Sequence, residues 1–174
     1  MSDLNRSEKR PCVSADVPDW RREAKPALSW DPGRALLASI RSYQKARLSR
    51  SLLARIQRLV AVVRHRFWSA VSGADIPLNC RIDGGLLLPH PNGIVIHPDA
   101  EIGPNCLIFQ QVTLGGGENG APRLAGHVDI GAGAKILGAV KVGAHARIGA
   151  NAVVLIDVPS GATAVGVPAR VLER

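Results

Sequence analysis

The chain has 174 residues and a formal net charge of +8, from 22 Lys and Arg against 14 Asp and Glu. A hydrophobic content of 46% excludes a disordered chain, and the length suits one compact domain with an appended element. No apolar stretch matches a membrane span or a secretory signal, so we expect no integral membrane association. Three cysteines without CxxC spacing predict neither disulfides nor a zinc knuckle, and favour the reducing cytoplasm.

The charge is distributed unevenly. Residues 1–28 hold six basic and five acidic side chains, residues 29–72 hold nine and one, and residues 73–174 hold seven and eight. Glycine and aromatic residues divide at the same place, since 17 of 18 glycines follow residue 72 and five of six aromatic residues precede it. We therefore predict two architectures in one chain.

Residues 1–28 mix charges with three prolines and show no apolar period, which predicts a mobile N-terminal arm. Over residues 29–72 apolar side chains recur at helical spacing. Asp31-Pro32 suits the start of one helix, and Ser49 or Ser51 suits the start of a second, because their oxygens can accept unpaired backbone N–H groups. Arginines occupy much of the remaining surface, so this segment is predicted to be a basic, amphipathic pair of helices.

These arginines raise the question of a nucleic-acid partner, because phosphate neutralisation gives most nonspecific affinity. No aromatic stacking array or recognition motif accompanies them. We therefore expect no nucleic-acid partner; solvated helix faces, or docking on an acidic partner or a membrane surface, fit the pattern better.

After Gly73 the apolar residues recur every six positions. The repeated aliphatic residues are Ile96, Ile102, Ile108, Leu114, Ile130, Ile136, Val142, Ile148 and Val154. Mostly small residues follow them by four positions, and glycine often follows directly. Neither the helical period of 3.6 nor the strand period of 2 explains this spacing, so a repeat architecture is required.

The period predicts a triangular prism. If each unit forms one short strand and one turn, three units close a coil of about 18 residues, and coils stack at about 4.8 Å. Aliphatic side chains then point inward in columns, and the other inward position must be small because the interior is narrow. We predict a mainly β fold, with about five coils over residues 74–160.

Two interruptions of the repeat are candidate functional sites, because solenoids build binding surfaces at such places. The first is a two-residue insertion between Leu88 and Ile96, and it contains His90. The second separates Leu114 from Ile130 by sixteen residues where six would do. About ten residues, GGGENGAPRL, are therefore predicted to leave the prism as a glycine-rich loop.

The run LPHPNGIVIHPDAEIGPNCLIFQQVTLGG, the later GAGAKILG and the ending AVGVPAR resemble the serine O-acetyltransferase family of hexapeptide-repeat acyltransferases. The resemblance covers about residues 74–172. It implies a left-handed parallel β-helix as the acyltransferase domain over residues 73–174, with a loop at 115–127 and a C-terminal tail. It also implies acetyl transfer from acetyl-CoA to a hydroxyl group, with L-serine as the first-choice acceptor, for cysteine biosynthesis.

The resemblance assigns catalytic roles to two residues. His90 matches the general base that removes the proton from the acceptor hydroxyl, and Asp75 matches the aspartate that orients this base. An imidazole suits the task because a large fraction of it is neutral at cytosolic pH. The amides of glycines 115–117 are candidates for stabilising the thioester oxyanion.

In the family, acetyl-CoA lies in the groove between neighbouring prisms of a trimer. The resemblance implies contacts from Gly116, Ala132 and Ala150, with Arg170 near the nucleotide phosphates and Lys135 as a further phosphate contact. It implies a homotrimer or a dimer of trimers in the cytoplasm. No metal is expected, because zinc needs three convergent histidines and the histidine spacing offers no such trio.

Two departures from the family concern the acceptor. Pro89 stands where the family usually has an aspartate before the base, and Ala121-Pro122 stands where it usually has His-Pro. An alternative is therefore acetylation of a sugar hydroxyl in polysaccharide synthesis. A second alternative is a noncatalytic trimeric interaction protein.

Overall fold

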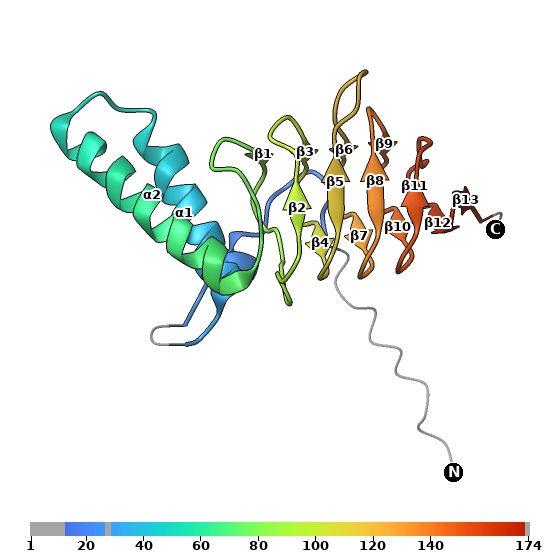
Figure 1. Cartoon of the computed structure of the whole chain (residues 1–174), viewed down its shortest axis with the longest axis horizontal. Helices are drawn as coiled ribbons and strands as arrows, with labels where there is room; N and C mark the ends of the chain where they lie inside the picture. Colours follow the sequence, from blue (N-terminus) through green and yellow to red (C-terminus); the bar gives the residue numbers. More distant parts are fainter. Residues whose placement is uncertain (1–12, 27–28, 173–174) are drawn as a thin grey trace, which may run out of the picture.

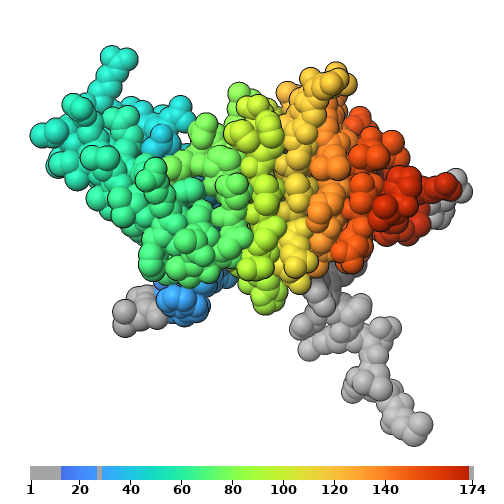
Figure 2. All heavy atoms as spheres, viewed as in Figure 1, coloured from blue at the N-terminus to red at the C-terminus, as the bar shows by residue number. Residues whose placement is uncertain are grey.

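The computed structural model describes residues 13–26 and 29–172. A β-helix runs along the long axis of the molecule, and two helices lie at its N-terminal end (Figures 1 and 2). None of the helices in the described ranges combines the length and the apolar content that a bilayer crossing requires.

The β-helix consists of short strands in three sheets, one for each face of a prism. The first sheet contains β2 (Val95–Ile96), β5 (Thr113–Gly115), β8 (Lys135–Leu137) and β11 (Val153–Val154). The second contains β1 (Arg81–Ile82), β3 (Glu101–Ile102), β6 (Arg123–Leu124) and β9 (Lys141–Val142). The third contains β4 (Leu107–Ile108), β7 (Asp129–Ile130), β10 (Arg147–Ile148), β12 (Thr163–Gly166) and β13 (Ala169–Val171). All pairings are parallel except the β12–β13 hairpin, as the six-residue period predicts.

The core consists of aliphatic columns that cross the coils. Strand register stacks Ile96 on Leu114, Leu114 on Ile136 and Ile136 on Val154, and each side chain is at most 2% exposed. Small residues such as Ala100 and Ala134 fill the second inward position. Burial of these columns holds five coils together, and the predicted prism is confirmed.

The second interruption is smaller than predicted. Leu124, which the sequence analysis assigns to the loop, lies in β6 and stacks between Ile102 and Val142. Since Ile102 and Leu124 are 22 residues apart, only four residues exceed the regular 18-residue coil. The prediction was wrong here because every coil needs a strand on each face, and Leu124 closes the second face with a spacing of ten instead of six. The loop that leaves the prism is therefore confined to the residues around Gly117 and Gly120, which exchange two backbone hydrogen bonds.

The two helices form as their sequence predicts. Helix α1 (Pro32–Ala46) begins after Asp31, whose Oδ1 accepts the Arg34 N–H over 2.9 Å. Helix α2 (Leu52–Ser72) begins after Ser51 and ends at Gly73, which has a φ of 67°. Helix α1 buries Leu36, Leu37 and Ile40 in the same core as the first coils, so it closes the open end of the prism. Helix α2 packs on α1 through Ala54 and Ala61.

The described part of the N-terminal segment, residues 13–26, is packed against the prism. Asn105 is fully buried, and its Nδ2 donates to the carbonyl oxygens of Ser14 and Val17 while its Oδ1 accepts the Asp19 N–H. Glu23, in the short helix η1 (Trp20–Glu23), accepts the N–H groups of residues 85 and 86 and pairs with Arg41 at 2.8 Å. This differs from the mobile arm predicted for residues 1–28, because buried partners satisfy a segment that shows no apolar period. Residues 1–12 and 27–28 of that range lie outside the described residues.

Candidate active site

His90 lies in the turn that the first insertion creates. The turn connects Leu87, which bridges to Leu107 in the second coil, with β2. Prolines on both sides of His90 restrict the backbone, and the Ile94 N–H closes the turn on Pro91 O at 3.2 Å. The side chain of His90 is exposed and makes no hydrogen bond or ion pair with any residue that the structure describes. Both ring nitrogens are therefore open to a ligand.

The edge of the prism that carries His90 lies between the third sheet and the first sheet, and we call it the His90 edge. Its turns are stacked coil on coil through backbone hydrogen bonds. The bonds are Gln111 N–H to Asn92 O (2.9 Å), Gly133 N–H to Gln110 O (2.9 Å) and Asn151 N–H to Ala132 O (2.8 Å). The turns of the first four coils thus form one continuous, narrow surface.

Three predicted acetyl-CoA contacts lie along this edge. Ala132 and Ala150 occupy equivalent turn positions in successive coils, because β7 and β10 pair in register. Lys135 begins the next strand, and its Nζ donates to the carbonyl oxygens of residues 111 and 133, both at 2.8 Å. Ala150 lies three coils from His90, which is about 14 Å at the usual strand spacing. This arrangement suits an extended ligand whose reactive end reaches His90.

Gln110 adds a polar group to the His90 edge that no sequence pattern predicts. The Leu87–Leu107 bridge places Gln110 one coil from His90. Its Oε1 is buried and has no hydrogen-bond partner among the described residues. A buried, unsatisfied acceptor costs about 1–3 kcal/mol. A ligand N–H group that reached this oxygen would remove that cost.

Asp75 opens the first coil, where it forms a parallel bridge with Val95 of β2. Its N–H donates to Ile94 O over 2.8 Å, and its side chain is exposed. The structure therefore brings Asp75 and His90 to the same end of the prism, Asp75 at an isolated bridge to β2 and His90 in the turn before β2. It shows no hydrogen bond between the two side chains, both of which are in the described range.

Gly116 and Arg170 lie away from the His90 edge. Gly116 follows β5 at the next edge, where a Cβ atom would come within 2.7 Å of His97 Nε2, so a larger residue would displace the imidazole. The neighbouring Gly117 N–H is already bonded to Gly120 O, which removes it from the candidate oxyanion donors. Arg170 is exposed on β13, the last strand of the third sheet.

A cavity of about 340 Å³ lies beside the His90 turn, at the contact between α1 and the first coil. Asp31 and Arg34 contribute opposite charges to its wall, and their side chains approach each other at 3.5 Å. Gly33 allows this close contact, because a Cβ atom there would lie 2.5 Å from Leu88 O. The other lining residues are Trp30, Pro32, Leu87, Leu88, Pro89 and Pro91. A small zwitterion, with one positive and one negative group, matches this wall.

From the sequence, Asp31 is predicted only as a helix cap, and Arg34 is only one of the basic residues of the helical segment. No local pattern places them near His90, because their position depends on α1 closing the end of the prism. The one available signal was Gly33, the single glycine before residue 73, in the first turn of a predicted helix where it is unfavourable.

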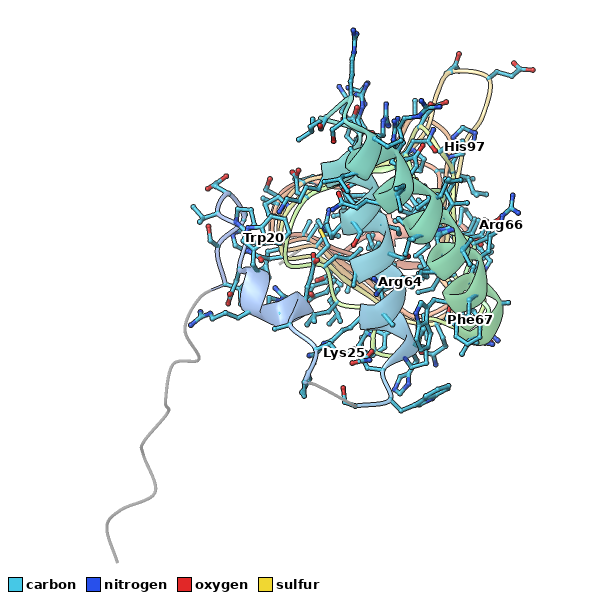
Figure 3. The ribbon with its side chains drawn as sticks, turned by 90° about the vertical axis from the view of Figure 1, so that its left-hand side faces the viewer. Trp20, Lys25, Arg64, Arg66, Phe67 and His97 are labelled. Carbon is cyan, nitrogen blue, oxygen red and sulfur yellow. The ribbon has the colours of Figure 1, made fainter. Side chains whose placement is uncertain are left out.

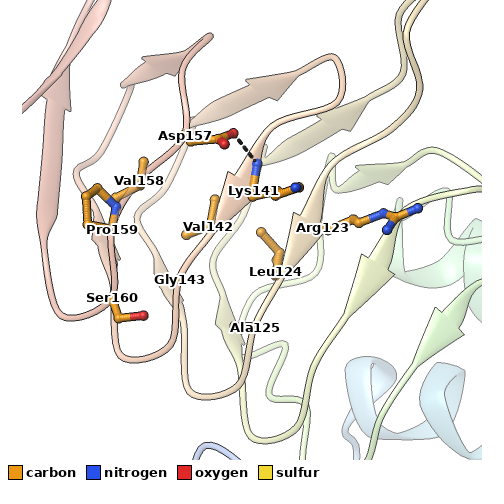
Figure 4. A pocket seen from close by; sticks show the side chains of 10 residues that line it. All are labelled: Arg123, Leu124, Ala125, Lys141, Val142, Gly143, Asp157, Val158, Pro159 and Ser160. Carbon is orange, nitrogen blue, oxygen red and sulfur yellow. Dashed lines mark hydrogen bonds between the residues drawn. The ribbon is translucent and has the colours of Figure 1, made fainter.

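A wider groove of about 560 Å³ lies on the second face (Figure 4). Arg123 and Lys141 line it, and Asp157 accepts the Lys141 N–H over 2.8 Å. The second face lies opposite the His90 edge of the triangle. The predicted site residues are thus not brought together in this groove.

The buried thiols play no part in the candidate site. Burial raises the pKa of Cys80 and of Cys106 to about 11, so both are protonated at neutral pH. The thiols donate to the carbonyl oxygens of residues 97 and 125. No group of three metal-ligating side chains converges within the described part of the chain.

The chain is similar in sequence and in structure to several proteins named serine acetyltransferase. The chain is 46% identical over 108 residues to the serine acetyltransferase of Synechococcus elongatus, covering 60% of this chain and 44% of that protein. Soybean serine acetyltransferase complexed with serine shares 40% identity and a TM-score of 0.63, over 77% of this chain and 56% of that one. A serine acetyltransferase in complex with CoA shares 37% identity and a TM-score of 0.69, over 82% and 58%. No protein-family model matches the chain.

The chain spans about half the length of the curated relatives it matches. The matched structures nevertheless cover about four fifths of this chain, which is more than the prism alone. They confirm the predicted left-handed β-helix with its short helical region. By its repeat sequence and its fold, the chain belongs to the serine acetyltransferase family.

Proposed function

We propose that the protein is an acetyl-CoA-dependent O-acetyltransferase that converts L-serine to O-acetylserine for cysteine biosynthesis. The observation that carries the proposal is the sequence and fold shared with serine acetyltransferases along the prism that bears His90. One solved relative is complexed with serine and another with CoA, which supports these two ligands.

In this proposal His90 is the general base. It takes the proton from the serine hydroxyl while the oxygen attacks the thioester carbon of acetyl-CoA. The tetrahedral intermediate collapses with cleavage of the C–S bond, and the imidazolium returns its proton to the leaving thiolate. The products are O-acetylserine and CoA, and no covalent enzyme intermediate forms. Asp75 is the orienting residue, which requires its exposed side chain to turn towards His90 in the complex.

Acetyl-CoA is proposed to lie along the His90 edge, with its thioester at His90. Ala132 and Ala150 let the backbone approach the pantetheine arm, whose amide N–H groups are suitable donors to Gln110 Oε1. We also propose phosphate contacts from Lys135 on this edge and from Arg170, which lies off the edge on the last strand of the third sheet. Gly116 occupies another edge, so it can contact the same acetyl-CoA only from a neighbouring prism.

The acceptor is proposed to bind in the cavity between α1 and the His90 turn. Asp31 attracts the ammonium group of serine, and Arg34 attracts its carboxylate. These charges offset the missing aspartate at Pro89 and the missing histidine at Ala121. A neutral sugar would leave both charges unused, so the cavity favours an amino acid over a sugar hydroxyl.

We propose a homotrimer, or a dimer of trimers, in the cytoplasm. Support for assembly comes from apolar side chains that remain exposed along and beside the first sheet: Val95, Leu137, Leu155 and Ile156. Contact between prisms would bury them and would form the groove that Gly116 needs. The free thiols of Cys80 and Cys106 are consistent with a reducing compartment.

The test is release of CoA from acetyl-CoA, followed with a thiol reagent, for a panel of acceptors that includes L-serine and nucleotide sugars. We expect turnover with L-serine and its loss by more than about 10²-fold in His90→Ala, because a general base contributes about 10²–10⁴-fold. His145→Ala is the matched control, since His145 is an exposed turn residue on a different edge.

Three outcomes would count against the proposal. Wild-type turnover in His90→Ala would exclude the mechanism, and turnover with a nucleotide sugar but not with serine would replace the acceptor. A folded protein that binds no acetyl-CoA in calorimetry would instead support the noncatalytic alternative.

A further inference from the structure

His97 lies at the edge between the first and second sheets, directly after β2, and we call this edge the His97 edge. Its N–H donates to Leu114 O over 2.8 Å, and its carbonyl oxygen accepts the Ala100 N–H over 2.9 Å, so the backbone of the turn is fixed. The imidazole packs on Gly116 of the next coil and stays partly exposed. Figure 3, which views the molecule along its long axis, shows His97 on a different side from Trp20 of the N-terminal segment.

The contacts of the His97 ring select one tautomer. Nδ1 accepts the Asp99 N–H over 3.2 Å. Because a ring nitrogen that accepts a hydrogen bond carries no proton, the neutral imidazole carries its proton on Nε2. Nε2 makes no hydrogen bond to any described residue, and neither does the N–H of Gly116, on which the ring packs. Two N–H donors therefore lie next to each other at this edge, without acceptors in the described part of the chain.

The exposed apolar side chains of the first sheet indicate which surfaces meet in the proposed trimer. Val95 and Leu137 lie on this sheet, and both are exposed. A ring of three prisms that buries them turns the first sheet of every subunit towards the threefold axis. This sheet is bounded by the His90 edge on one side and by the His97 edge on the other. Because a ring joins unlike surfaces, the His90 edge of one subunit meets the His97 edge of the next.

The two edges also meet at matching heights along the prism. The His90 turn immediately precedes β2, and His97 immediately follows it. When the threefold axis runs along the prism, rotation leaves each residue at its own height, so His97 of each subunit is level with His90 of its neighbour. Gly116 lies one coil farther along, because β5 pairs with β2 in register. His97 Nε2–H therefore reaches the end of the proposed acetyl-CoA site at which the thioester reacts.

We infer that His97 completes the active site of the neighbouring subunit as a donor to the oxyanion. This inference rests on the proposed acetyl transfer and on the proposed trimer. When the acceptor oxygen attacks, the π electrons of the thioester C=O move onto its oxygen, which then accepts hydrogen bonds from His97 Nε2–H and Gly116 N–H. When the C–S bond breaks, the C=O bond forms again and both hydrogen bonds weaken. His97 transfers no proton, because the acceptor proton moves through His90.

The test measures CoA release from acetyl-CoA with the acceptor that the wild type uses. We expect His97→Ala to lower kcat about 10²-fold, since loss of one oxyanion donor costs about 10²–10³-fold. KM for the acceptor and the dissociation constant of acetyl-CoA in calorimetry should change less than about twofold, because the donor acts on the transition state. His97→Gln should recover most of the loss, because its amide N–H can replace Nε2–H. His145→Ala is the matched control, as an exposed turn histidine on the third edge.

Mixed trimers test whether His97 acts across the subunit interface. When His90→Ala and His97→Ala subunits are co-expressed in equal amounts, about one site in four receives His90 from one subunit and His97 from the next. We expect turnover near a quarter of the wild-type value, well above that of either variant alone. If both residues served a site within one subunit, no intact site would form. Absence of recovery would therefore overturn the inference.

The kinetic outcomes separate this inference from the proposed function. An active wild type with an equally active His97→Ala variant would overturn the inference and leave the proposed function intact. A wild type that releases no CoA with any acceptor would overturn both. A loss of kcat that glutamine does not restore, or that accompanies loss of the trimer in light scattering, would assign His97 a structural role and would overturn the inference alone.

Discussion

The prism and the helical pair use apolar residues in opposite ways. In the prism, side chains such as Ile102 and Ile130 are at most 2% exposed, and the outer surface is close to neutral in charge. In α2, leucine and valine remain on the surface between arginines, and only three residues are buried. The prism is therefore stabilised by its own core, whereas the apolar side chains of α2 are exposed and available for contact with another molecule.

This contrast predicts a large difference between two similar truncations. Ile102→Ala should destabilise the protein by about 2–5 kcal/mol, because it opens a cavity in a packed column. Leu59→Ala should change the free energy of unfolding by less than about 0.5 kcal/mol, because that side chain is 68% exposed. Chemical denaturation at equal protein concentration measures both values. A comparable loss in the two variants would show that α2 is buried in the assembled protein and would break the contrast.

Glu23 contacts both regions, so a substitution there measures how much the N-terminal segment contributes to the free energy of unfolding. Its carboxylate accepts two backbone N–H groups of the first coil and pairs with Arg41 on α1, and only 9% of the side chain is exposed. Glu23→Gln keeps the shape but removes the charge, and we expect a loss of about 1–3 kcal/mol in denaturation. Asp19→Asn is the control, because the Asp19–Arg21 pair lies on the surface. If both variants lose the same free energy of unfolding, Glu23 does not fix the segment to the prism, and the predicted mobile arm would be the better description.

The cavity proposed for the acceptor involves both regions, because the start of α1 supplies its charges and the prism supplies Leu88, Pro89 and Pro91 beside His90. Arg34→Leu should raise KM for L-serine about tenfold or more, since a charge-assisted hydrogen bond contributes about 1.5–3 kcal/mol. Asp31→Asn is the sharper variant, because asparagine still caps the helix and only the charge is lost. KM for acetyl-CoA should stay unchanged in both. If KM for serine is unchanged in both variants, the start of α1 does not bind the acceptor.

Local sequence predicted the prism better than it predicted the contacts between regions. The columns follow from a period of six that any window of the chain reveals, and caps such as Asp31 are signalled within four residues. The position of Leu124 escaped prediction because its spacing of ten has no local marker. Contacts such as Asn105 with Ser14 and Val17 join residues far apart in the chain, and no periodicity encodes them. The charged cavity and the buried Gln110 oxygen could not be predicted either, because they also depend on residues that are far apart in the sequence.

The smallest effect is expected at another edge of the prism, where the rings of two histidines meet edge to face. His127 Nδ1 and His145 Nδ1 lie 2.8 Å apart. Burial lowers the pKa of His127; the His145, Arg22 and Arg147 charges lower it too, and Asp129 opposes them. As pH falls below about 6.5 the unfolded chain therefore takes up a proton before the folded chain does, and stability declines with pH in that window.

His127→Asn removes this titration and keeps a residue that tolerates the positive φ of 54° at this turn. The variant loses the hydrogen bond to His145 and should be slightly less stable than the wild type at about pH 8. Between about pH 8 and pH 5.5 that gap should narrow by a few tenths of a kcal/mol, because solvent screening limits the effect at a partly exposed site. His145→Asn loses the same bond but retains the titrating His127, so its gap should narrow less. Parallel decline of all three proteins in thermal melts would mean that the acid sensitivity of the prism arises elsewhere. The arginines of α2, which stay charged throughout this range, cannot supply it.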